Sequence, residues 1–245
     1  MPLSRRQDLI RALPYARRYA RALTGSQPRG DLLVAESLRE LAVSDTGEMS
    51  PRHSLYRSIS RQFQPQDTSG TRDGLGGVER KLLLLTALEE LTVSEAAKVL
   101  ETEVQRASDI LAHAHAGLRT VAETSILIIE DEPIIAMDIE ELVRSCGHQV
   151  AGVAATEADA IELARRTRPG LILADINLGA GGDGMNAVAS ILRQHDAPVI
   201  FVTAYPERLL TGEAVEPTFV ITKPFEPTTL AIATYQAVTG GPQID

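Results

Sequence analysis

Three consecutive carboxylates, Glu130, Asp131 and Glu132, come directly after an aliphatic run at positions 126–129. Like charges at this spacing repel one another unless a cation lies among them. A further carboxylate, Asp175, follows the apolar stretch 170–174. Carboxylate oxygens are ligands of hard divalent cations, and Mg²⁺ is usually held by a few carboxylates together with water and phosphate oxygens. This pattern predicts a magnesium site.

Two other polar residues stand at the ends of apolar stretches in the same half of the chain. Thr203 follows residues 198–202, and Lys223, which precedes Pro224, follows residues 218–222. Where the carboxyl ends of several strands converge, these groups would join the carboxylates at one rim. A solvated acidic rim without a ligand is the alternative interpretation of the carboxylates alone.

The elements that must position these groups alternate in type. Val- and Ile-rich segments typical of short buried strands occupy residues 125–129, 148–154, 170–174, 198–202 and 218–222. Amphipathic helical patterns occupy residues 133–146, 156–168, 184–194 and 226–238. This alternation predicts an α/β fold with a doubly wound, five-stranded parallel sheet. In such a sheet the carboxyl ends of the strands form the ligand-binding crevice.

The constellation resembles the receiver domain of two-component response regulators, over a domain that we place at residues 124–245. The resemblance implies that Asp175 is the phosphoacceptor, taking a phosphoryl group from a sensor histidine kinase or a phosphotransfer protein. It also implies that Mg²⁺ is held by Glu130, Asp131, Asp175 and the backbone carbonyl of Asn177. A phosphohydrolase using Asp175 is disfavoured, because haloacid-type hydrolases carry a second carboxylate where this chain has Asn177.

The same resemblance gives roles to the remaining rim residues. Thr203 would donate a hydrogen bond to a phosphoryl oxygen, Lys223 would neutralise another, and the Lys223–Pro224 peptide bond would be cis. Many receivers carry a switching aromatic three residues before this lysine, but this chain has Val220 there. An aromatic, Tyr205, follows Thr203 by two positions, and it either couples the switch or simply packs the segment after the fourth strand.

The first half of the chain is helical in pattern throughout. Apolar spacing indicates helices over residues 7–25, 30–43, 50–63, 77–91, 92–101 and 103–119. The first of these is a single helix or a pair kinked at Pro14, and the third has Ser50 as its expected N-cap and Pro51 at its first position. Residues 64–76 are poor in apolar side chains and are interpreted as a linker.

These helices resemble regions two and four of an extracytoplasmic-function sigma factor, at residues 1–63 and 77–122 respectively. Two features disfavour promoter binding. The stretch "AVSDTGEMS" at 42–50 has no aromatic for stacking on an unpaired base, and the expected recognition helix has one arginine, Arg106, against Glu103 and Asp109. We therefore expect that this half does not bind DNA directly.

A sigma-like half joined to a C-terminal receiver is similar to the PhyR family, the anti-anti-sigma response regulators of the alphaproteobacterial general stress response. The resemblance implies a regulator and not an enzyme. Phosphorylation would free the sigma-like half to sequester an anti-sigma factor of the NepR type. The alternative is a receiver-gated DNA-binding regulator or sigma factor. Six arginines near the start of the chain form either a solvated helix face or a partner contact: Arg5, Arg6, Arg11, Arg17, Arg18 and Arg21.

Composition is consistent with two chemically different halves. Up to Glu123 the chain has 17 Lys and Arg against 16 Asp and Glu, whereas beyond it there are 7 against 17. The single cysteine, Cys146, excludes an internal disulfide and multi-cysteine metal sites. No apolar run is long enough to span a membrane, and arginines interrupt the N-terminal segment. We expect a cytoplasmic protein without a membrane partner.

Overall fold

The computed structural model describes residues 3–44, 46–63, 77–117, 123–204 and 219–239. These residues divide into two compact units, one within the part up to Ala116 and the other from Gly117 onward. Among the described residues, no helix combines the length and the apolar character needed to cross a membrane.

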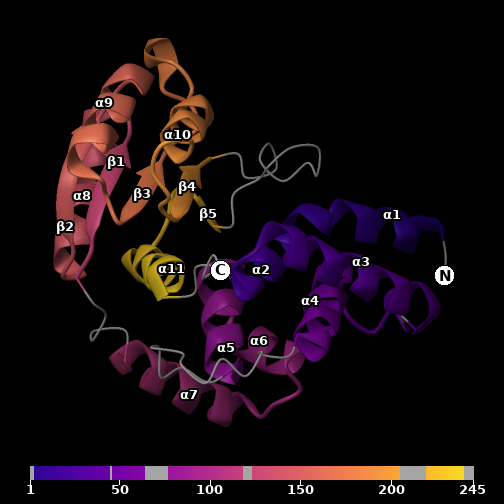
Figure 1. Cartoon of the computed structure of the whole chain (residues 1–245). Coiled ribbons are helices and arrows are strands. Elements are labelled where there is room, and N and C mark those ends of the chain that lie inside the picture. The colour runs from indigo at the N-terminus through magenta and orange to yellow at the C-terminus, as the bar shows by residue number, and fades with distance from the viewer. Residues whose placement is uncertain (1–2, 45, 64–76, 118–122, 205–218, 240–245) are drawn as a thin grey trace. The chain divides into compact units, whose positions relative to one another are not determined.

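The first unit consists entirely of helices in the part of the chain that is described (Figure 1). Their bounds are α1 Leu3–Arg11, α2 Leu13–Thr24, α3 Gln27–Ser44, α4 Pro51–Gln62, α5 Gly77–Ala87, α6 Val93–Val99 and α7 Val104–Gly117. The first predicted helix is therefore a pair, with Pro14 in the first turn of α2. A proline is tolerated there because the first backbone N–H groups of a helix have no intrahelical acceptor.

Local capping groups mark two helix starts. The Ser50 hydroxyl accepts a hydrogen bond from the backbone N–H of His53, with Pro51 at the first position of α4, which confirms the predicted cap. Helix α6 begins at a capping box, in which Thr92 accepts from the Glu95 N–H and the Glu95 carboxylate accepts from the Thr92 N–H. Such reciprocal bonds satisfy donors that the helix itself leaves unpaired.

Helix α5 lies in the centre of this unit. Leu82, Leu83, Leu84 and Leu85 are all fully buried, so neighbouring helices cover this part of α5 on every side. Tyr19 and Tyr56 are also fully buried, with their rings in edge-to-face contact at 5.2 Å between centroids.

Two arginines of α2 correct the interpretation of a solvated arginine face. Arg18 and Arg21 are buried, with relative exposures of 2% and 0%. Arg21 donates to both carboxylate oxygens of Asp31, at 2.9 and 2.8 Å, and Arg18 pairs with Glu89. Neither side chain is a solvated surface residue, because each is desolvated and neutralised by a carboxylate inside the unit.

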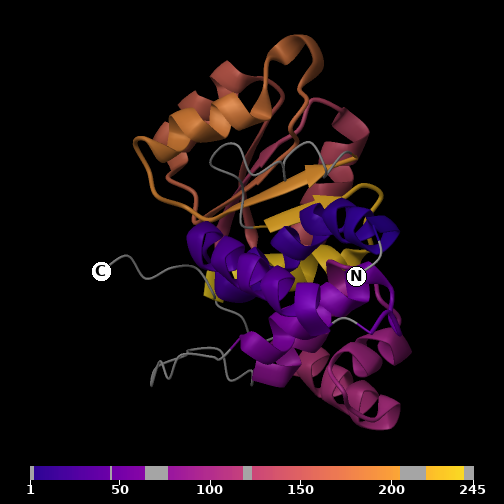
Figure 2. The same ribbon diagram turned by 90° about the vertical axis from the view of Figure 1, so that its right-hand side faces the viewer.

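The second unit contains a five-stranded sheet whose order is β2-β1-β3-β4-β5, with every pair parallel (Figures 1 and 2). The strands are β1 Ser125–Ile129, β2 Gln149–Ala154, β3 Leu171–Ala174, β4 Val199–Thr203 and β5 Phe219–Thr222. This confirms the predicted α/β class. Strand β3 is buried at every position, as expected for a central parallel strand covered on both faces.

The helices of the second unit form two pairs. Their bounds are α8 Pro133–Ser145, α9 Glu157–Thr167, α10 Gly184–Leu192 and α11 Pro227–Thr239, with a short 3₁₀ turn η2 at Gly179–Gly181. Helix α9 packs against α10, and α8 packs against α11. Right-handed connections in a sheet of this order place the two pairs on opposite faces. The expected linker 64–76 and the candidate switch residue Tyr205 lie outside the described residues.

Candidate functional site

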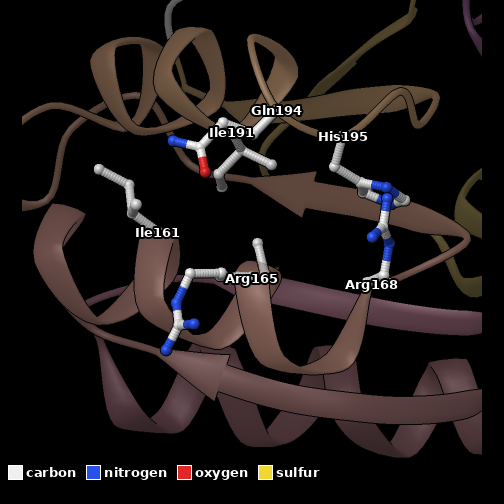
Figure 3. Close-up of a pocket in the computed structure, with 7 residues that line it drawn as sticks. Ile161, Arg165, Arg168, Ile191, Gln194 and His195 are labelled. Atoms are coloured by element: carbon white, nitrogen blue, oxygen red, sulfur yellow. The ribbon is translucent and has the colours of Figure 1, made fainter.

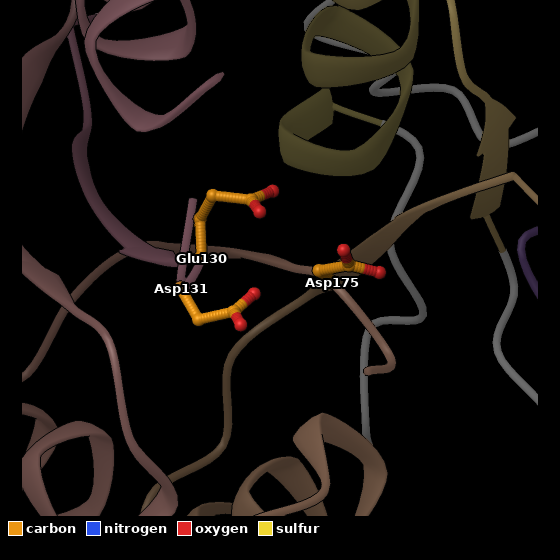
Figure 4. A group of neighbouring side chains, drawn as sticks. All are labelled: Glu130, Asp131 and Asp175. Carbon is orange, nitrogen blue, oxygen red and sulfur yellow. The ribbon is translucent and has the colours of Figure 1, made fainter. Parts of the chain in front are cut away.

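Three carboxylates gather at the carboxyl ends of two neighbouring strands (Figure 4). Glu130 and Asp131 follow β1, and Asp175 follows β3. Because Ile129 is paired with Ala174 in the register of these strands, the residues that follow both strands emerge side by side. One oxygen from each carboxylate lies within 4.8 Å of the other two. The sequence-predicted acidic residues are thus brought together.

Lys223, which follows β5, supplies a positive charge to this cluster. Its Nζ atom donates to Oε2 of Glu130 and to Oδ2 of Asp175, both at 2.7 Å. Its peptide bond to Pro224 is cis. Burial alone would lower the pKa of Lys223, but hydrogen bonds to Asp175 and Glu130 outweigh that effect and raise it. The lysine is therefore an ammonium ion at neutral pH.

Glu130 is the most buried member, with only 1% of its side chain exposed. Its burial raises the pKa of the carboxyl group, and the negative charge of Asp175 adds to this, while Lys223 opposes it. A cation beside Glu130 favours the ionised form. The burial of this carboxylate therefore depends on a positive charge within the cluster.

Backbone groups orient Asp175 on its other side. Its Oδ1 atom accepts hydrogen bonds from the N–H groups of Ile176 at 2.6 Å and Asn177 at 3.4 Å, while Oδ2 faces Lys223. Asn177 also forms an isolated antiparallel bridge with Asp183. Both carboxylate oxygens of Asp175 are therefore fixed by hydrogen bonds, and the bridge to Asp183 fixes the backbone that follows Asp175.

Asp183 and Gly184 support this loop, a role that sequence reasoning did not assign to them. Asp183 caps α10 by accepting from the N–H groups of Met185 and Asn186, at 2.7 and 3.1 Å. The Gly184 N–H donates to the carbonyl of Ile176, and a Cβ at Gly184 would lie only 1.8 Å from the carbonyl oxygen of Asp175. Only glycine fits this close approach, a requirement that a short glycine-rich segment does not reveal by itself.

Thr203 ends β4 and is buried, with 3% relative exposure. Its carbonyl oxygen accepts from the backbone N–H of Lys223 at 2.8 Å, so the two residues are adjacent on neighbouring strands. Of the predicted site residues, the structure thus brings Glu130, Asp131, Asp175 and Lys223 into one cluster and sets Thr203 beside it.

The donor set of this cluster is suitable for a hard divalent cation. The ligand atoms are carboxylate oxygens from three side chains, which is the chemistry that Mg²⁺ prefers, and a receiver domain typically binds that ion at such a cluster.

A separate hollow of about 120 Å³ between α9 and α10 has different chemistry (Figure 3). It is lined by Ile161, Ala164, Arg165, Arg168, Ile191, Gln194 and His195. None of these is a carboxylate, so the hollow is not part of the acidic site.

Comparisons with known proteins agree with both units. Residues 126–234 match the response regulator receiver domain, and residues 9–60 match the Sigma2 domain of PhyR. The phyllosphere-induced regulator PhyR of Methylorubrum extorquens is 41% identical over 254 residues, covering 96% of this chain and 95% of that protein. The chain belongs to the PhyR family. It is accordingly a response regulator and not a catalytic enzyme, as the sequence predicted.

Solved structures of PhyR-family proteins are among those similar to this chain. The response regulator PhyR from Brucella abortus is 41% identical, covers 97% of this chain and 94% of its own, and superposes with a TM-score of 0.84. Anti-anti-sigma factor PhyR from Bartonella quintana, complexed with the anti-sigma factor NepR, is 40% identical over 95% of this chain and 97% of its own, with a TM-score of 0.41.

Proposed function

We propose that this PhyR-family chain is a phosphorylation-switched anti-anti-sigma factor. Phosphoryl transfer to Asp175 frees the sigma-like helices to bind an anti-sigma factor of the NepR type, which releases the general stress sigma factor. The observation that carries this proposal is an acidic cluster paired with Lys223 in the same chain as a PhyR-type Sigma2 match. The sequence identity to a PhyR protein crystallised with NepR supports the choice of partner.

The chemistry proposed for the receiver is transfer from a phosphohistidine. A carboxylate oxygen of Asp175 attacks the phosphorus, a P–O bond forms, the P–N bond breaks, and the imidazole of a sensor histidine kinase or phosphotransfer protein leaves. Lys223 lies next to Asp175 and neutralises one phosphoryl oxygen, and the Thr203 hydroxyl donates to another. Positioning and charge stabilisation are the main requirements of phosphoryl transfer.

A magnesium ion fits this reaction. Glu130, Asp131, Asp175 and the backbone carbonyl of Asn177 are the groups that would hold it, and the bound ion would neutralise charge on the phosphoryl oxygens. Lys223 contributes a single positive charge beside three carboxylates, so net negative charge remains in the cluster for a second cation. Tyr205 is the candidate that couples the phosphorylated site to the rest of the chain.

The proposed domains have the bounds that were predicted from the sequence. Residues 1–63 and 77–122 correspond to sigma regions two and four, residues 64–76 to a linker, and residues 124–245 to the receiver. We propose that the protein acts in the cytoplasm and without direct DNA contact. In support, Arg106 is the single Lys or Arg of α7, whereas phosphate affinity requires several cations on one face.

The test is a pull-down of the organism's NepR-type anti-sigma factor by the full chain, with MgCl₂ and with or without a small phosphodonor. The expected result is retention only with the phosphodonor, lost in Asp175→Asn. Asp138→Asn, which removes an exposed carboxylate of α8, is the matched control and should behave as the wild type. The proposal is contradicted if the wild type retains equal amounts of the anti-sigma factor with and without the phosphodonor. It is also contradicted if Asp175→Asn takes up phosphate on a phosphate-affinity gel. A gel-shift assay with promoter DNA at low salt tests the DNA-binding alternative.

A further inference from the structure

A buried charged cluster lies inside the helical unit. Glu89, whose side chain is fully buried, accepts two hydrogen bonds from Arg18, from Nε at 2.8 Å and from Nη2 at 3.0 Å. Arg52 Nη2 donates to the Glu89 carboxylate at 3.1 Å and to its backbone carbonyl at 2.9 Å. The Tyr56 hydroxyl donates to the same carboxylate. We call Arg18, Arg52, Tyr56 and Glu89 the Glu89 cluster.

The members of the Glu89 cluster come from two different parts of the chain. Arg18 lies on α2, and Arg52 and Tyr56 lie on α4, all within the Sigma2 match at residues 9–60. Glu89 follows α5, beyond the undescribed segment 64–76. One carboxylate therefore joins the block of α2, α3 and α4, which pack against one another, to the block that contains α5, α6 and α7.

The groups around the Glu89 cluster hold its side chains in one arrangement. The guanidinium of Arg52 stacks 4.2 Å from the centroid of the Tyr15 ring, and that of Arg18 lies 5.6 Å from it. Burial raises the pKa of Tyr56 well above 10, and the charge of Glu89 adds to the effect, so its hydroxyl remains a donor. A carboxylate buried at this depth is stable only while its cations and donors stay in place.

Surface contacts between the same two blocks are weaker. Arg61 pairs with Glu101 at 2.5 Å, but their side chains are 54% and 44% exposed. Exposed pairs of this kind contribute little, because water screens the charges and both long side chains lose freedom. Among the described ion pairs between these blocks, those of Glu89 are thus the most buried.

We propose that Glu89 is a positioning residue for anti-sigma recognition, locking the two helical blocks into one rigid body that presents a single preformed binding surface. This inference rests on the proposed function and names the residues on which the surface depends. A partner that contacts both blocks binds more weakly when they move independently, because ordering them then reduces the affinity. If the locked state falls to about a tenth of the population, the apparent Kd rises about tenfold.

The test compares Glu89→Gln with Glu101→Gln in the full chain. Each variant removes one carboxylate that joins the same two blocks, but only the first removes a buried one. Arg52→Gln is a gentler variant, because the Arg52 side chain is 32% exposed and its loss leaves Arg18 paired with Glu89. Spin labels on cysteines replacing Arg39 of α3 and Arg106 of α7, in a Cys146→Ser background, report the distance between the blocks. The anti-sigma factor is then titrated into each phosphodonor-treated protein below its unfolding temperature.

The expected result is a narrow distance distribution for the wild type and Glu101→Gln, and a broad one for Glu89→Gln with at least about a tenfold loss of affinity. Arg52→Gln should give a smaller loss of the same kind, which serves as the test if Glu89→Gln does not fold. A narrow distribution with unchanged affinity in the Glu89 and Arg52 variants overturns the inference. If the wild type itself does not bind, the proposed function fails, and the distance measurement alone still decides whether Glu89 locks the blocks.

Discussion

The Nζ atom of Lys223 lies 2.7 Å from Oδ2 of Asp175, although 48 positions separate the two residues in the sequence. The same nitrogen lies 2.7 Å from Oε2 of Glu130. A single ammonium group thus sits between two carboxylates that a divalent cation would also neutralise. The lysine and the proposed metal ion consequently act on the same charges.

Lys223→Met tests this relationship. Without Mg²⁺ the variant receiver should unfold at a lower temperature than the wild type, because two carboxylates lose their common cation. Its stabilisation by MgCl₂ should be larger, since the metal no longer shares Glu130 and Asp175 with an ammonium group. A tenfold tighter Kd would add about 1.4 kcal/mol at saturating metal. Thermal unfolding with and without MgCl₂ measures both effects.

The control for this prediction is Arg144→Met, which removes an exposed cation paired with Glu140 on α8. It should leave the magnesium-dependent shift unchanged. Equal shifts in wild type and Lys223→Met would mean that the lysine does not compete with the metal. Asp131→Asn should reduce the shift, because it removes one of the three clustered carboxylates.

Gly184→Ala should impair phosphate uptake. The added Cβ would meet the Asp175 carbonyl oxygen at 1.8 Å, so the backbone that carries Asp175 must move. A displacement of about 1 Å at a reacting group can cost about a hundredfold in rate. The initial rate of phosphate incorporation from a small phosphodonor, followed on a phosphate-affinity gel, measures the effect.

A glycine elsewhere in the receiver provides the comparison. Gly147 has a φ of +83° but no atom within 4 Å of an added Cβ. Gly147→Ala should therefore cost about 1–2 kcal/mol of stability through backbone strain, with an unchanged rate of phosphate uptake. Similar losses of uptake in both variants would show that the Gly184 effect is only a general loss of stability.

Sequence reasoning predicted that the residues of the acidic cluster lie close together, because two independent patterns coincide there. The strands are near-continuous aliphatic runs, and a charged or hydroxyl residue follows each of the strands that form the rim. Parallel strands bring those ends together, so the proximity of Glu130, Asp175 and Lys223 follows from topology. The support from Asp183 and Gly184 does not follow in this way, because it depends on a backbone approach that only coordinates reveal.

The helical unit was harder to predict in detail. An arginine on an amphipathic helix normally lies in solvent, and nothing near Arg18 in the sequence indicates otherwise. Its partner Glu89 is 71 positions away, outside any local pattern. The choice between one helix and two around Pro14 likewise depended on packing, since both satisfy the apolar spacing.

The stability of the receiver should fall as the pH is lowered below about 6.5. His148 is buried, and its Nδ1 accepts from the Thr124 N–H at 3.4 Å. Burial lowers the pKa of its imidazole below 6.5, although Glu123 opposes this. The unfolded chain therefore binds the proton more readily, so this contribution is complete above 6.5 and is lost as the pH falls toward the folded-state pKa.

The measurement is the urea midpoint of residues 117–245, which retain Glu123 and the Thr124 peptide N–H, at pH 7.5 and at pH 5.5. His148→Gln, which keeps a polar side chain but does not titrate, should show a smaller difference between the two pH values. The acidic cluster is identical in both proteins, so it cancels in the comparison. An unchanged difference in the variant would assign the pH dependence to other groups.

Residues 1–122 expressed alone should bind the anti-sigma factor without any phosphodonor. In the proposed switch, the unphosphorylated receiver keeps the binding-competent state rare, and a state populated to about 1% weakens the apparent affinity about a hundredfold. Removing the receiver removes that restraint, so the truncated protein should bind about as tightly as the phosphorylated full chain. Residues 124–245 alone should not bind, and full-length Asp175→Asn should stay weak. Calorimetric titration compares the four proteins. If residues 1–122 bind no better than the unphosphorylated full chain, the receiver does not restrain the helices and must itself contribute to binding.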